Sequence, residues 1–434
     1  MASEVLDRPG FAPADADLVR LNEGYPSWLL DRRRSALSSH HAQGIPTVKH
    51  EEWKYTSLRG WSEVAFNAPV RATVDSDAIA PYLHGLEDAI RLVFVNGFFD
   101  QGLSTLDSVA GLEVSTLADA DPAVLEKHLG AYAKVEEFTF VALNTAAFSS
   151  GTFVRVRRNA VIERPIHIVH LTVASDSPQA SYPRTLVIAE SGSQAKVVET
   201  FATVGSHPGF SNAVTEVYVE SNAHLEMVKA QLESETSFHI AATEAKVERD
   251  GTFLTYNVTL GGALTRNDIN VYLNGENGHV RMDGVYALTG DQHCDNHTRL
   301  DHAMPHCDSF EVYKGVLDGK STGVFNGKIF VHLDAQKTDA KQTNQALLLS
   351  PTATINTKPQ LEIFADDVKC THGATVGQLR SDALFYLRAR GIPAAKARAL
   401  LVYAFAAEVI EKITLDPLRN DLERRLFEKL GTEV

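Results

Sequence analysis

Cys370 and His372 are the two side chains whose types and spacing most directly suggest chemistry. They are separated by one residue, Thr371. On a strand, the two-residue side-chain period places the thiol and the imidazole on one face and Thr371 on the other. Side chains that point the same way in parallel suit joint binding of a third body better than a hydrogen bond to each other. The pair is therefore a candidate for soft-metal ligation.

Two other interpretations of this pair stay open. A half-buried structural cysteine beside a solvent-facing histidine needs no ligand, since cysteine is among the most buried residue types. A nucleophilic Cys–His pair is the enzymatic interpretation of the same residues. The surroundings favour an accessible site, because Asp366, Asp367 and Lys369 make this segment unusually polar.

A second group of metal-ligand types lies between residues 293 and 307. Its candidates for a secondary metal site are His297, His302, His306 and Cys307, preceded by His293 and Cys294. On a strand, His293, Asp295 and His297 would share one face while Cys294 took the other, so no simple paired zinc pattern results. We favour structural histidines and turn residues here, and retain a histidine–carboxylate metal site as the alternative.

Composition excludes several classes of function. The chain has 434 residues, with 41 Lys and Arg against 55 Asp and Glu, a formal charge of -14. This balance argues against nucleic acid or an anionic membrane surface as the main partner. Three cysteines are too few for a disulfide scaffold, so we expect free thiols in a reducing compartment.

The termini and apolar runs indicate a soluble cytoplasmic protein. Residues 1–17 have neither a basic start nor an apolar run, so they predict no signal peptide, and their lack of large apolar groups predicts disorder. Ordered structure is expected to begin near Leu18. The best apolar run, residues 399–407, is too short to span a bilayer.

The segments that must position these candidate sites are mainly β. Between residues 149 and 377, short alternating runs are punctuated by Gly, Asn and Asp, and no convincing amphipathic helix occurs. A β-region of this length exceeds a typical sandwich, so either two β-domains or one elongated β-solenoid is implied. We favour the solenoid, although the chain shows no strict repeat.

Helical patterns flank this β-region on both sides. In the N-terminal region, residues 1–148, helices are expected over 26–42, with Arg32, Arg33 and Arg34 on the solvated face, and over 122–133. A strand at 91–99 meets an Asn-Gly turn. The C-terminal region, residues 378–434, predicts three helices, which could cap the end of the solenoid or form a docking surface for another protein.

The segment GVLDGKS at residues 315–321 resembles a phosphate-binding loop. Its glycines are separated by three residues where the motif requires four, and a strand follows where the motif requires a helix. We therefore predict a turn between two strands, with no nucleotide site.

Several segments together resemble the SufB/SufD family of iron–sulfur cluster assembly proteins. They are YKGVL (313–317), GVFNGKI (323–329), AQKTDA (335–340), TKPQLEI (357–363), ADDVKCTHGAT (365–375) and LFYLRARGI (384–392). Two further segments, EWKYT (52–56) and VFVNG (93–97), together with the absence of an N-terminal cysteine motif, resemble the SufD members of that family more than the SufB members.

The resemblance implies a mainly β fold, a right-handed parallel β-helix (β-solenoid) core with helical N-terminal and C-terminal regions. It implies a SufB partner against the β-helix, the ATPase SufC on the C-terminal helices, and a transient iron–sulfur cluster shared with SufB, with no cofactor tightly bound in the isolated chain. Cys370 and especially His372 match the family's functional positions. The implied SufC-contact residues are Leu384, Phe385, Leu387, Leu401, Tyr403 and Phe405.

We therefore expect a non-catalytic scaffold subunit in which His372 supplies an imidazole, Cys370 a supporting thiolate, and SufC the ATP hydrolysis. Cys370 and His372 should lie at a protein–protein edge of the β-helix. Because unpaired strands readily template pairing, the isolated chain is expected to form a homodimer through that edge. The alternative is a stand-alone metal-dependent or polysaccharide-active β-helix enzyme that uses the histidines of residues 293–306.

Overall fold

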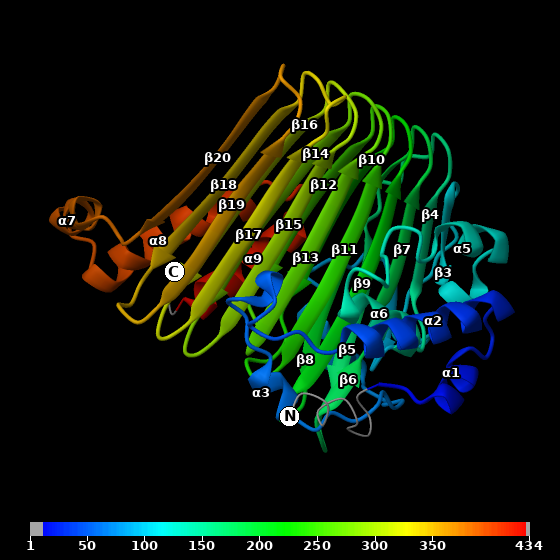
Figure 1. Ribbon diagram of the computed structural model, residues 1–434. Helices are drawn as coiled ribbons and strands as arrows, with labels where there is room; N and C mark the ends of the chain where they lie inside the picture. The colour runs from blue at the N-terminus through cyan, green and yellow to red at the C-terminus, as the bar shows by residue number, and fades with distance from the viewer. Residues whose placement is uncertain (1–11, 431–434) are drawn as a thin grey trace.

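The computed structural model describes residues 12–430, and its centre is a parallel β-solenoid of two facing sheets (Figure 1). The β20 sheet contains, in spatial order, β2 (Phe98–Phe99), β1 (Ile90–Val95), β5 (Ile166–Val173), β8 (Gln194–Val204), β10 (His224–Gln231), β12 (Thr252–Thr259), β14 (His279–Leu288), β16 (Asp308–Leu317), β18 (Asp339–Leu348) and β20 (Lys369–Gly377). The β19 sheet contains β19 (Thr354–Ile363), β17 (Thr322–Val331), β15 (His293–His302), β13 (Leu264–Leu273), β11 (Phe238–Val247), β9 (Gly209–Val219), β7 (Arg184–Ala189), β4 (Thr152–Val156) and β3 (Leu112–Thr116), and β6 (Gln179–Ser181) pairs with β9. The expected solenoid is confirmed.

Side-chain alternation explains why these segments form a solenoid. Along β16, Ser309, Glu311 and Tyr313 are buried, while Phe310 and Val312 between them are partly exposed. The inward positions of successive turns stack on one another and form a continuous interior core. As expected, no helix interrupts residues 152–377.

A repeat is present in the structure although the sequence shows none of fixed length. Phe238 pairs with Leu264, 26 residues later, whereas Thr322 pairs with Thr354, 32 residues later. Loops of different length absorb the difference between turns, while the strands keep their register. A fixed-period search therefore fails on this chain.

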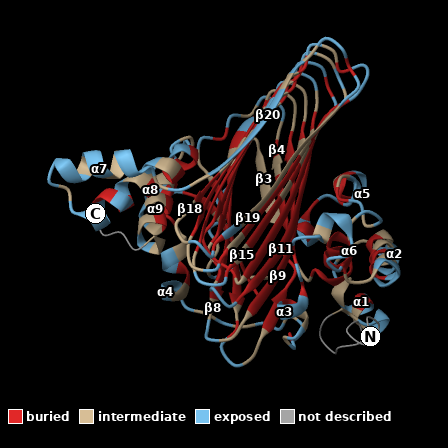
Figure 2. Cartoon of the chain, turned by 60° about the vertical axis from the view of Figure 1, so that its left-hand side comes forward, coloured by how far each residue is buried: buried red, intermediate tan, exposed pale blue. Residues whose placement is uncertain are grey.

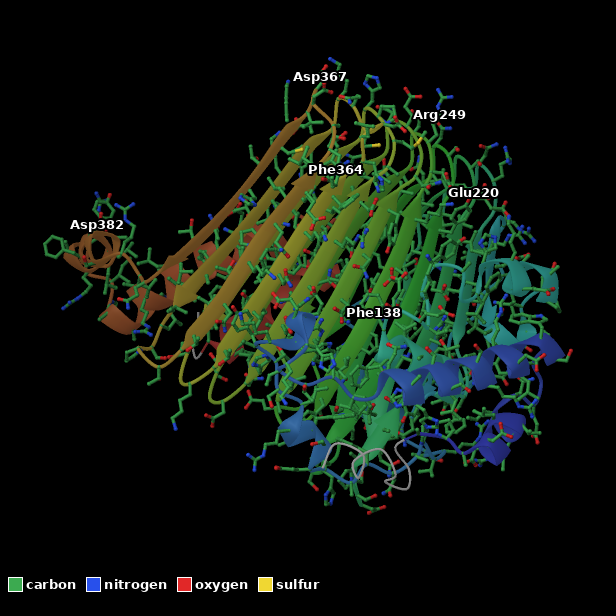
Figure 3. All side chains as sticks on the ribbon, in the orientation of Figure 1. Phe138, Glu220, Arg249, Phe364, Asp367 and Asp382 are labelled. Carbon is green, nitrogen blue, oxygen red and sulfur yellow. The ribbon has the colours of Figure 1, made fainter. Side chains whose placement is uncertain are left out.

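One ridge of turns nevertheless repeats its backbone conformation. A residue with positive φ recurs once per turn, at Asn222, Asp250, Asn277, His306 and Lys337. Each of these residues donates its backbone N–H to a carbonyl of the following turn, for example Asn222 to Arg249 O at 3.0 Å and Lys337 to Asp367 O at 2.7 Å. Figure 3 shows Glu220, Arg249 and Asp367 along this ridge. Asn and Asp tolerate the left-handed region better than most residues, which explains their recurrence.

The N-terminal helices lie on both sheets: most cover part of the β19 sheet, whereas Ile79 packs with Val93 and Val169 on the outer face of the β20 sheet. These helices are α1 (Asp15–Leu21), α2 (Ser27–Gln43), α3 (Arg59–Ser62), α4 (Ser76–Ile79), α5 (Pro122–His128) and α6 (Thr139–Ala147), with 3-10 turns η1 (Glu51–Trp53), η2 (Ala80–Tyr82) and η3 (Leu117–Asp119). Helix α2 packs on α6, and α6 packs on β9 and β11. Both outer faces of the solenoid need such cover, because strands of a parallel sheet are apolar on both faces.

Two expectations for this region were wrong in detail. Arg33 is fully buried and donates to the carbonyls of Ala146 and Phe148 at 3.0 and 2.9 Å, because those carbonyls lie at the C-terminal end of α6 without helical partners. The expectation that structure begins near Leu18 agrees with α1, in which Leu18 is buried and Asp17 accepts from the backbone N–H of Ala14. Residues 1–11 of the segment expected to be disordered lie outside the described residues. The helix expected over 122–133 ends at His128.

The N-terminal region also contributes strands to the solenoid. Strand β1 pairs in parallel with β5, and β3 pairs antiparallel with β4. The expected Asn-Gly turn is confirmed, since Asn96 and Gly97 have φ values of 51° and 79° between β1 and β2. The division of the chain at residues 148 and 377 stays a prediction.

The second and third C-terminal helices pack on a face of the solenoid and not on its end, whereas the first contacts the second helix and projects from it (Figure 1). The three helices are α7 (Ser381–Ala389), α8 (Ala394–Ile410) and α9 (Asp416–Lys429), so the three expected helices are confirmed. Helix α8 packs on β12, β14 and β16, and its apolar side shares one core cluster with the outer face of the β20 sheet. The alternative of an end cap was wrong, because the apolar outer face of this sheet provides the larger burial. None of the helices described for residues 12–430 is long and apolar enough to cross a membrane.

Candidate functional site

β20 is the terminal strand of its sheet. Its strand partner is β18, with Cys370 opposite Ala340 and His372 opposite Gln342. The other sheet ends at β19, so the last turn of the solenoid is left open. Figure 2 shows β20 in the colours of exposed and intermediate residues, in contrast to the buried β9 and β11. Cys370 and His372 were expected at a protein–protein edge of the β-helix; they lie on an edge strand, and the contact with a partner stays a prediction.

Both candidate ligands face the solenoid interior at its open end. Ala340 and Gln342 are buried, and Cys370 packs against the main interior core cluster. Because side chains two residues apart share a face, His372 lies on the same side of β20 as Cys370. Cys370 is half-buried and His372 is exposed. The strand therefore offers a thiol and an imidazole side by side to a group arriving from beyond the last turn.

The electrostatics of Cys370 favour the neutral thiol. Burial raises the pKa of Cys370 and the carboxylate of Asp339 adds to the effect, while a hydrogen bond with the backbone of Ala340 opposes it. A metal that binds this sulfur must therefore displace a proton. Two donors are fewer than the four ligands of a typical iron–sulfur or zinc site, so the remaining ligands must come from elsewhere.

The turn before β20 holds the candidate strand in place. Lys337 forms an ion pair with Asp367, and the backbone N–H of Asp367 donates to Gln336 Oε1 at 3.0 Å. Figure 3 shows Phe364 and Asp367 at this end of the ridge of turns. The polar residues that drew attention to this segment thus tie it to the preceding turn.

Sequence reasoning missed two polar residues directly behind His372. Gln342 and Glu311 occupy the same inward column on the next two strands, β18 and β16. Gln342 Nε2 donates to Glu311 Oε2 at 2.8 Å, and both residues are buried. Burial raises the pKa of Glu311 to about 7, and the hydrogen bond from Gln342 opposes this rise. The signal in the sequence that could have revealed Gln342 and Glu311 is the occurrence of polar residues at inward positions of predicted strands.

The structure does not bring together the secondary metal candidates. His302 is inside the solenoid beside Ser309 Oγ at 2.9 Å, whereas His297 is on the outer face. His306 is the positive-φ residue of a turn, and Cys307 donates to Gly275 O at 3.3 Å. Across residues 12–430, no three His, Cys, Asp or Glu side chains are gathered so that they could hold a metal ion. All three cysteines are free, as expected.

His297 belongs to a network of charges that anchors the N-terminal region. It lies 3.0 Å from Asp295 and 3.3 Å from Glu52, and Arg266 donates to Asp295 at 2.8 Å. Burial lowers the pKa of His297, but Asp295 and Glu52 outweigh it and raise the value to about 9. Trp53 covers the Arg266 guanidinium at 3.9 Å. These contacts explain the EWKYT motif at residues 52–56, which fastens the chain to the outer face of the β19 sheet.

The segment that resembled a phosphate loop is a turn between strands. β16 ends at Leu317, Gly319 has a φ of 66°, and β17 begins at Thr322. The prediction of strand, turn and strand is confirmed.

Comparison with known proteins identifies the family. Residues 170–405 match the family described as "SUF system FeS cluster assembly, SufBD core domain", and residues 16–168 match "SufBD protein N-terminal region". The chain is 34% identical over 407 residues to "Iron-sulfur cluster assembly protein SufD" of Escherichia coli (strain K12), covering 92% of this chain and 93% of the relative.

Two further relatives match over most of their length. An "Iron-sulfur cluster assembly SufBD family protein" of Synechocystis is 33% identical over 410 residues, covering 92% of this chain and 90% of the relative. The SufD protein of Bacillus subtilis is 26% identical over 417 residues, covering 92% of this chain and 93% of the relative. The chain therefore belongs to the SufBD family of iron–sulfur cluster assembly proteins.

Proposed function

We propose that this chain is a non-catalytic scaffold subunit that supplies part of the ligand set for a nascent iron–sulfur cluster. His372 provides an imidazole and Cys370 a thiolate, both known types of iron–sulfur ligand. The observation that carries the proposal is the position of these two side chains on a terminal strand whose outer edge is unpaired, at the open end of the solenoid. The cluster is cargo that is built and passed on.

The partner that completes the site is a second β-solenoid subunit of the same family, SufB. The edges of β19 and β20 expose backbone donors and acceptors, and the side chains of both strands are exposed or half-buried along their whole length. Such an edge invites pairing with another chain. When this chain is isolated, a second copy can occupy the same edge, which gives the homodimer.

The ATPase SufC is proposed to dock on the C-terminal helices. On α7, Phe385 and Tyr386 are 74% and 57% exposed, and Leu384 and Leu387 flank them. Exposed aromatic side chains of this size are typical of interface anchors. On α8, Tyr403 stacks on Phe427 at 4.0 Å. We therefore assign the primary SufC contact to α7, with Leu401, Tyr403 and Phe405 behind it.

Loss of the imidazole tests the proposal. In the complete complex with SufB and SufC, His372→Ala should lower cluster formation at least about tenfold, because removing a ligand or its close support costs that much in metal binding. Cluster formation is measured by visible absorbance and iron content per complex. The matched control is His41→Ala, an exposed histidine on α2. Wild-type cluster formation by the His372→Ala complex would refute the assignment.

A pull-down tests the partners independently of the ligands. The tagged full chain should recover an ATPase and a second SufBD-family subunit from a native lysate of its source at low salt. Phe385→Ser should reduce recovery of the ATPase and leave recovery of the second subunit unchanged. Equal loss of both partners would contradict separate docking sites.

A further inference from the structure

Three residues on consecutive strands form one inward column that ends at the open edge. His372 on β20 is in register with Gln342 on β18, and Gln342 is in register with Glu311 on β16. Neighbouring strands of a sheet lie about 4.8 Å apart, so side chains in one column contact each other. Only the outermost member of this column, His372, is exposed.

The amide of Gln342 has a fixed orientation. Its Nε2 donates to Glu311 Oε2 at 2.8 Å, so the nitrogen faces β16. Its Oε1 is buried and has no partner in hydrogen-bond geometry among the described residues. The two polar atoms of an amide lie at opposite ends of the group, and β16 and β20 lie on opposite sides of β18. The unpartnered oxygen is therefore directed away from β16, toward the side of β18 on which β20 lies.

The opposite sheet holds this amide in place. Gly327 on β17 lies directly across the interior, and a Cβ atom added there would come within 2.4 Å of Gln342 Nε2 and 2.6 Å of Phe325 Cζ. The amide of Gln342 therefore packs directly against the backbone of Gly327, which has no side chain. A side chain at this position would displace it.

Buried polar atoms without partners are costly, so a buried acceptor at the end of a column indicates a donor that it is built to receive. Metal-ligating histidines almost always donate their second ring N–H to a carbonyl or carboxylate, which fixes the tautomer and the direction of the ligating nitrogen. Gln342 Oε1 is the carbonyl oxygen placed for this purpose. Glu311 in turn fixes the amide.

We propose that Gln342 is a positioning residue for His372: its amide oxygen accepts a ring N–H of His372 and directs the other ring nitrogen out of the open edge. Glu311 holds Gln342 in this orientation. The proposal rests on the role of His372 given above and adds the residues that orient it.

The tautomer of His372 tests the proposal in the full chain without any metal. Two-bond ¹⁵N–¹H spectra of histidine-labelled protein are recorded at about pH 8.5, where ordinary imidazoles are neutral, and the His372 signals are assigned from their loss in His372→Ala. The wild type should show one dominant tautomer. Gln342→Leu, which keeps the volume and removes the acceptor, should shift His372 to a mixture of tautomers.

Two further variants separate positioning from general damage. Asn344→Leu alters the next inward position of β18, where Asn344 donates to Thr357 Oγ1 at 2.7 Å, and should leave the His372 tautomer unchanged. Gly327→Ala keeps Gln342 but displaces its amide, and should reproduce the Gln342→Leu spectrum. Far-ultraviolet circular dichroism checks that each variant is folded.

In the complete complex, Gln342→Leu should weaken iron binding about 10–100-fold, the usual effect of losing such a support. A mixture of tautomers in the wild type, or a His372 tautomer that is the same in Gln342→Leu, would overturn the proposal. Failure of the proposed function would appear differently, as wild-type cluster formation by His372→Ala while the tautomer still depended on Gln342.

Discussion

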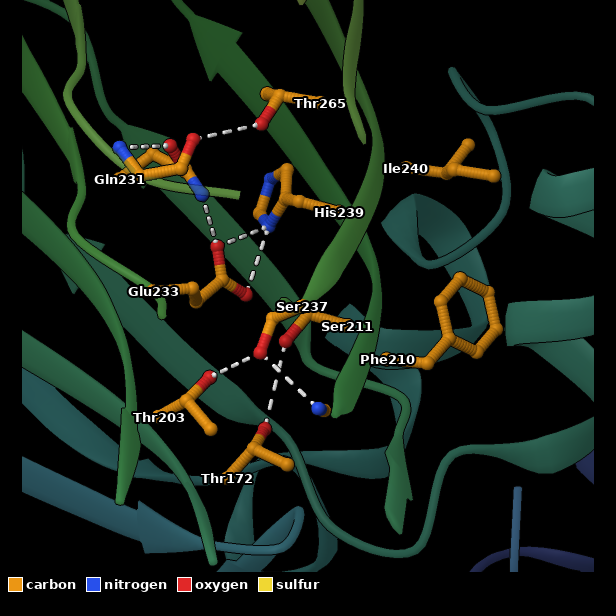
Figure 4. Close-up of polar contacts among 12 residues, drawn as sticks. Thr172, Thr203, Phe210, Ser211, Gln231, Glu233, Ser237, His239, Ile240 and Thr265 are labelled. Carbon is orange, nitrogen blue, oxygen red and sulfur yellow. Dashed lines mark hydrogen bonds and ion pairs between the residues drawn. The ribbon is translucent and has the colours of Figure 1, made fainter. Parts of the chain in front are cut away.

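Two of the buried carboxylates of the solenoid lie in very different surroundings. Glu233 lies in the middle of the solenoid, where Gln231 Nε2 donates to Oε2 at 2.5 Å and His239 Nδ1 lies 3.1 Å from Oε1 (Figure 4). Glu311 lies near the open end, where Oε2 accepts from Gln342 and Oε1 lies outside hydrogen-bond geometry to any described group. One carboxylate is fully partnered and the other is half partnered.

The pKa values follow from this difference. Burial raises the pKa of Glu233, but His239 and the hydrogen bonds outweigh it, so the pKa lies below its ordinary value. Burial raises the pKa of Glu311 to about 7, because fewer donors oppose it. The comparison shows that a buried carboxylate with donors at both oxygens keeps a low pKa, whereas one with a donor at a single oxygen does not.

The largest effect on stability should come from removing the fully partnered carboxylate, Glu233. Glu233→Ala leaves the donors of Gln231 and His239 buried without an acceptor, and should lower the free energy of unfolding by about 3–5 kcal/mol. Urea unfolding followed by circular dichroism measures the change. The control is Glu235→Ala, whose side chain is 65% exposed beside Lys429 and should cost less than about 1 kcal/mol. Equal costs for the two variants would remove the basis of the comparison.

The half-partnered carboxylate, Glu311, should make the free energy of unfolding depend on pH. The pKa of Glu311 is raised from its ordinary 4.5 to about 7 in the folded chain, so its contribution to stability is complete below pH 4.5 and is lost as the pH rises through 7. The loss amounts to about 3 kcal/mol. The Glu311→Gln variant has no carboxyl group at this position, so it should not lose this stability as the pH rises.

The test compares unfolding free energies at pH 5 and pH 8. Relative to the wild type, Glu311→Gln should become more stable by about 3 kcal/mol between these two values. The same pair of measurements on Asn344→Leu, which removes no titrating group, is the control. A difference between wild type and Glu311→Gln that does not change with pH would show that Glu311 titrates near its ordinary pKa.

The smallest effect on stability should come from Cys370→Ser, which is compared with the same substitution at Cys294. Cys294 is fully buried inside the solenoid, and burial raises its pKa to about 12, whereas Cys370 is half-buried at the edge. Cys294→Ser places a hydroxyl in that interior and should cost about 1–3 kcal/mol. Cys370→Ser should cost less than about 0.5 kcal/mol. Thermal unfolding of both variants decides whether the edge contributes as little to stability as its exposure indicates.

Local patterns were enough to predict the strands, because each strand carries its own alternation of inward and outward residues. The helices of residues 378–434 were predictable for the same reason, since the 3.6-residue period is written along each helix. The turn at Asn96 and Gly97 was predictable from two residues, because few residue types tolerate positive φ. These features depend on neighbours in the chain.

Contacts between distant segments could not be predicted in this way. Arg33 looked like a solvent-facing residue, yet it binds carbonyls more than a hundred residues away in sequence. His297 was predicted as a structural histidine, with metal ligation as the alternative, but its partner Glu52 from the N-terminal region was not predicted. Nothing near either residue in the sequence marks the partner, because these contacts are created when the N-terminal region packs on the β19 sheet.

By itself, the sequence determined that this chain has a long β-region with helices at both ends and that Cys370 and His372 share a face of one strand, because alternation and helical periodicity are local properties. Only the tertiary structure decided that β20 is the last strand of its sheet and that Gln342 and Glu311 stand behind His372. Strand order and register depend on loop lengths that vary from turn to turn, so residues about 30 positions apart become neighbours only when the solenoid closes.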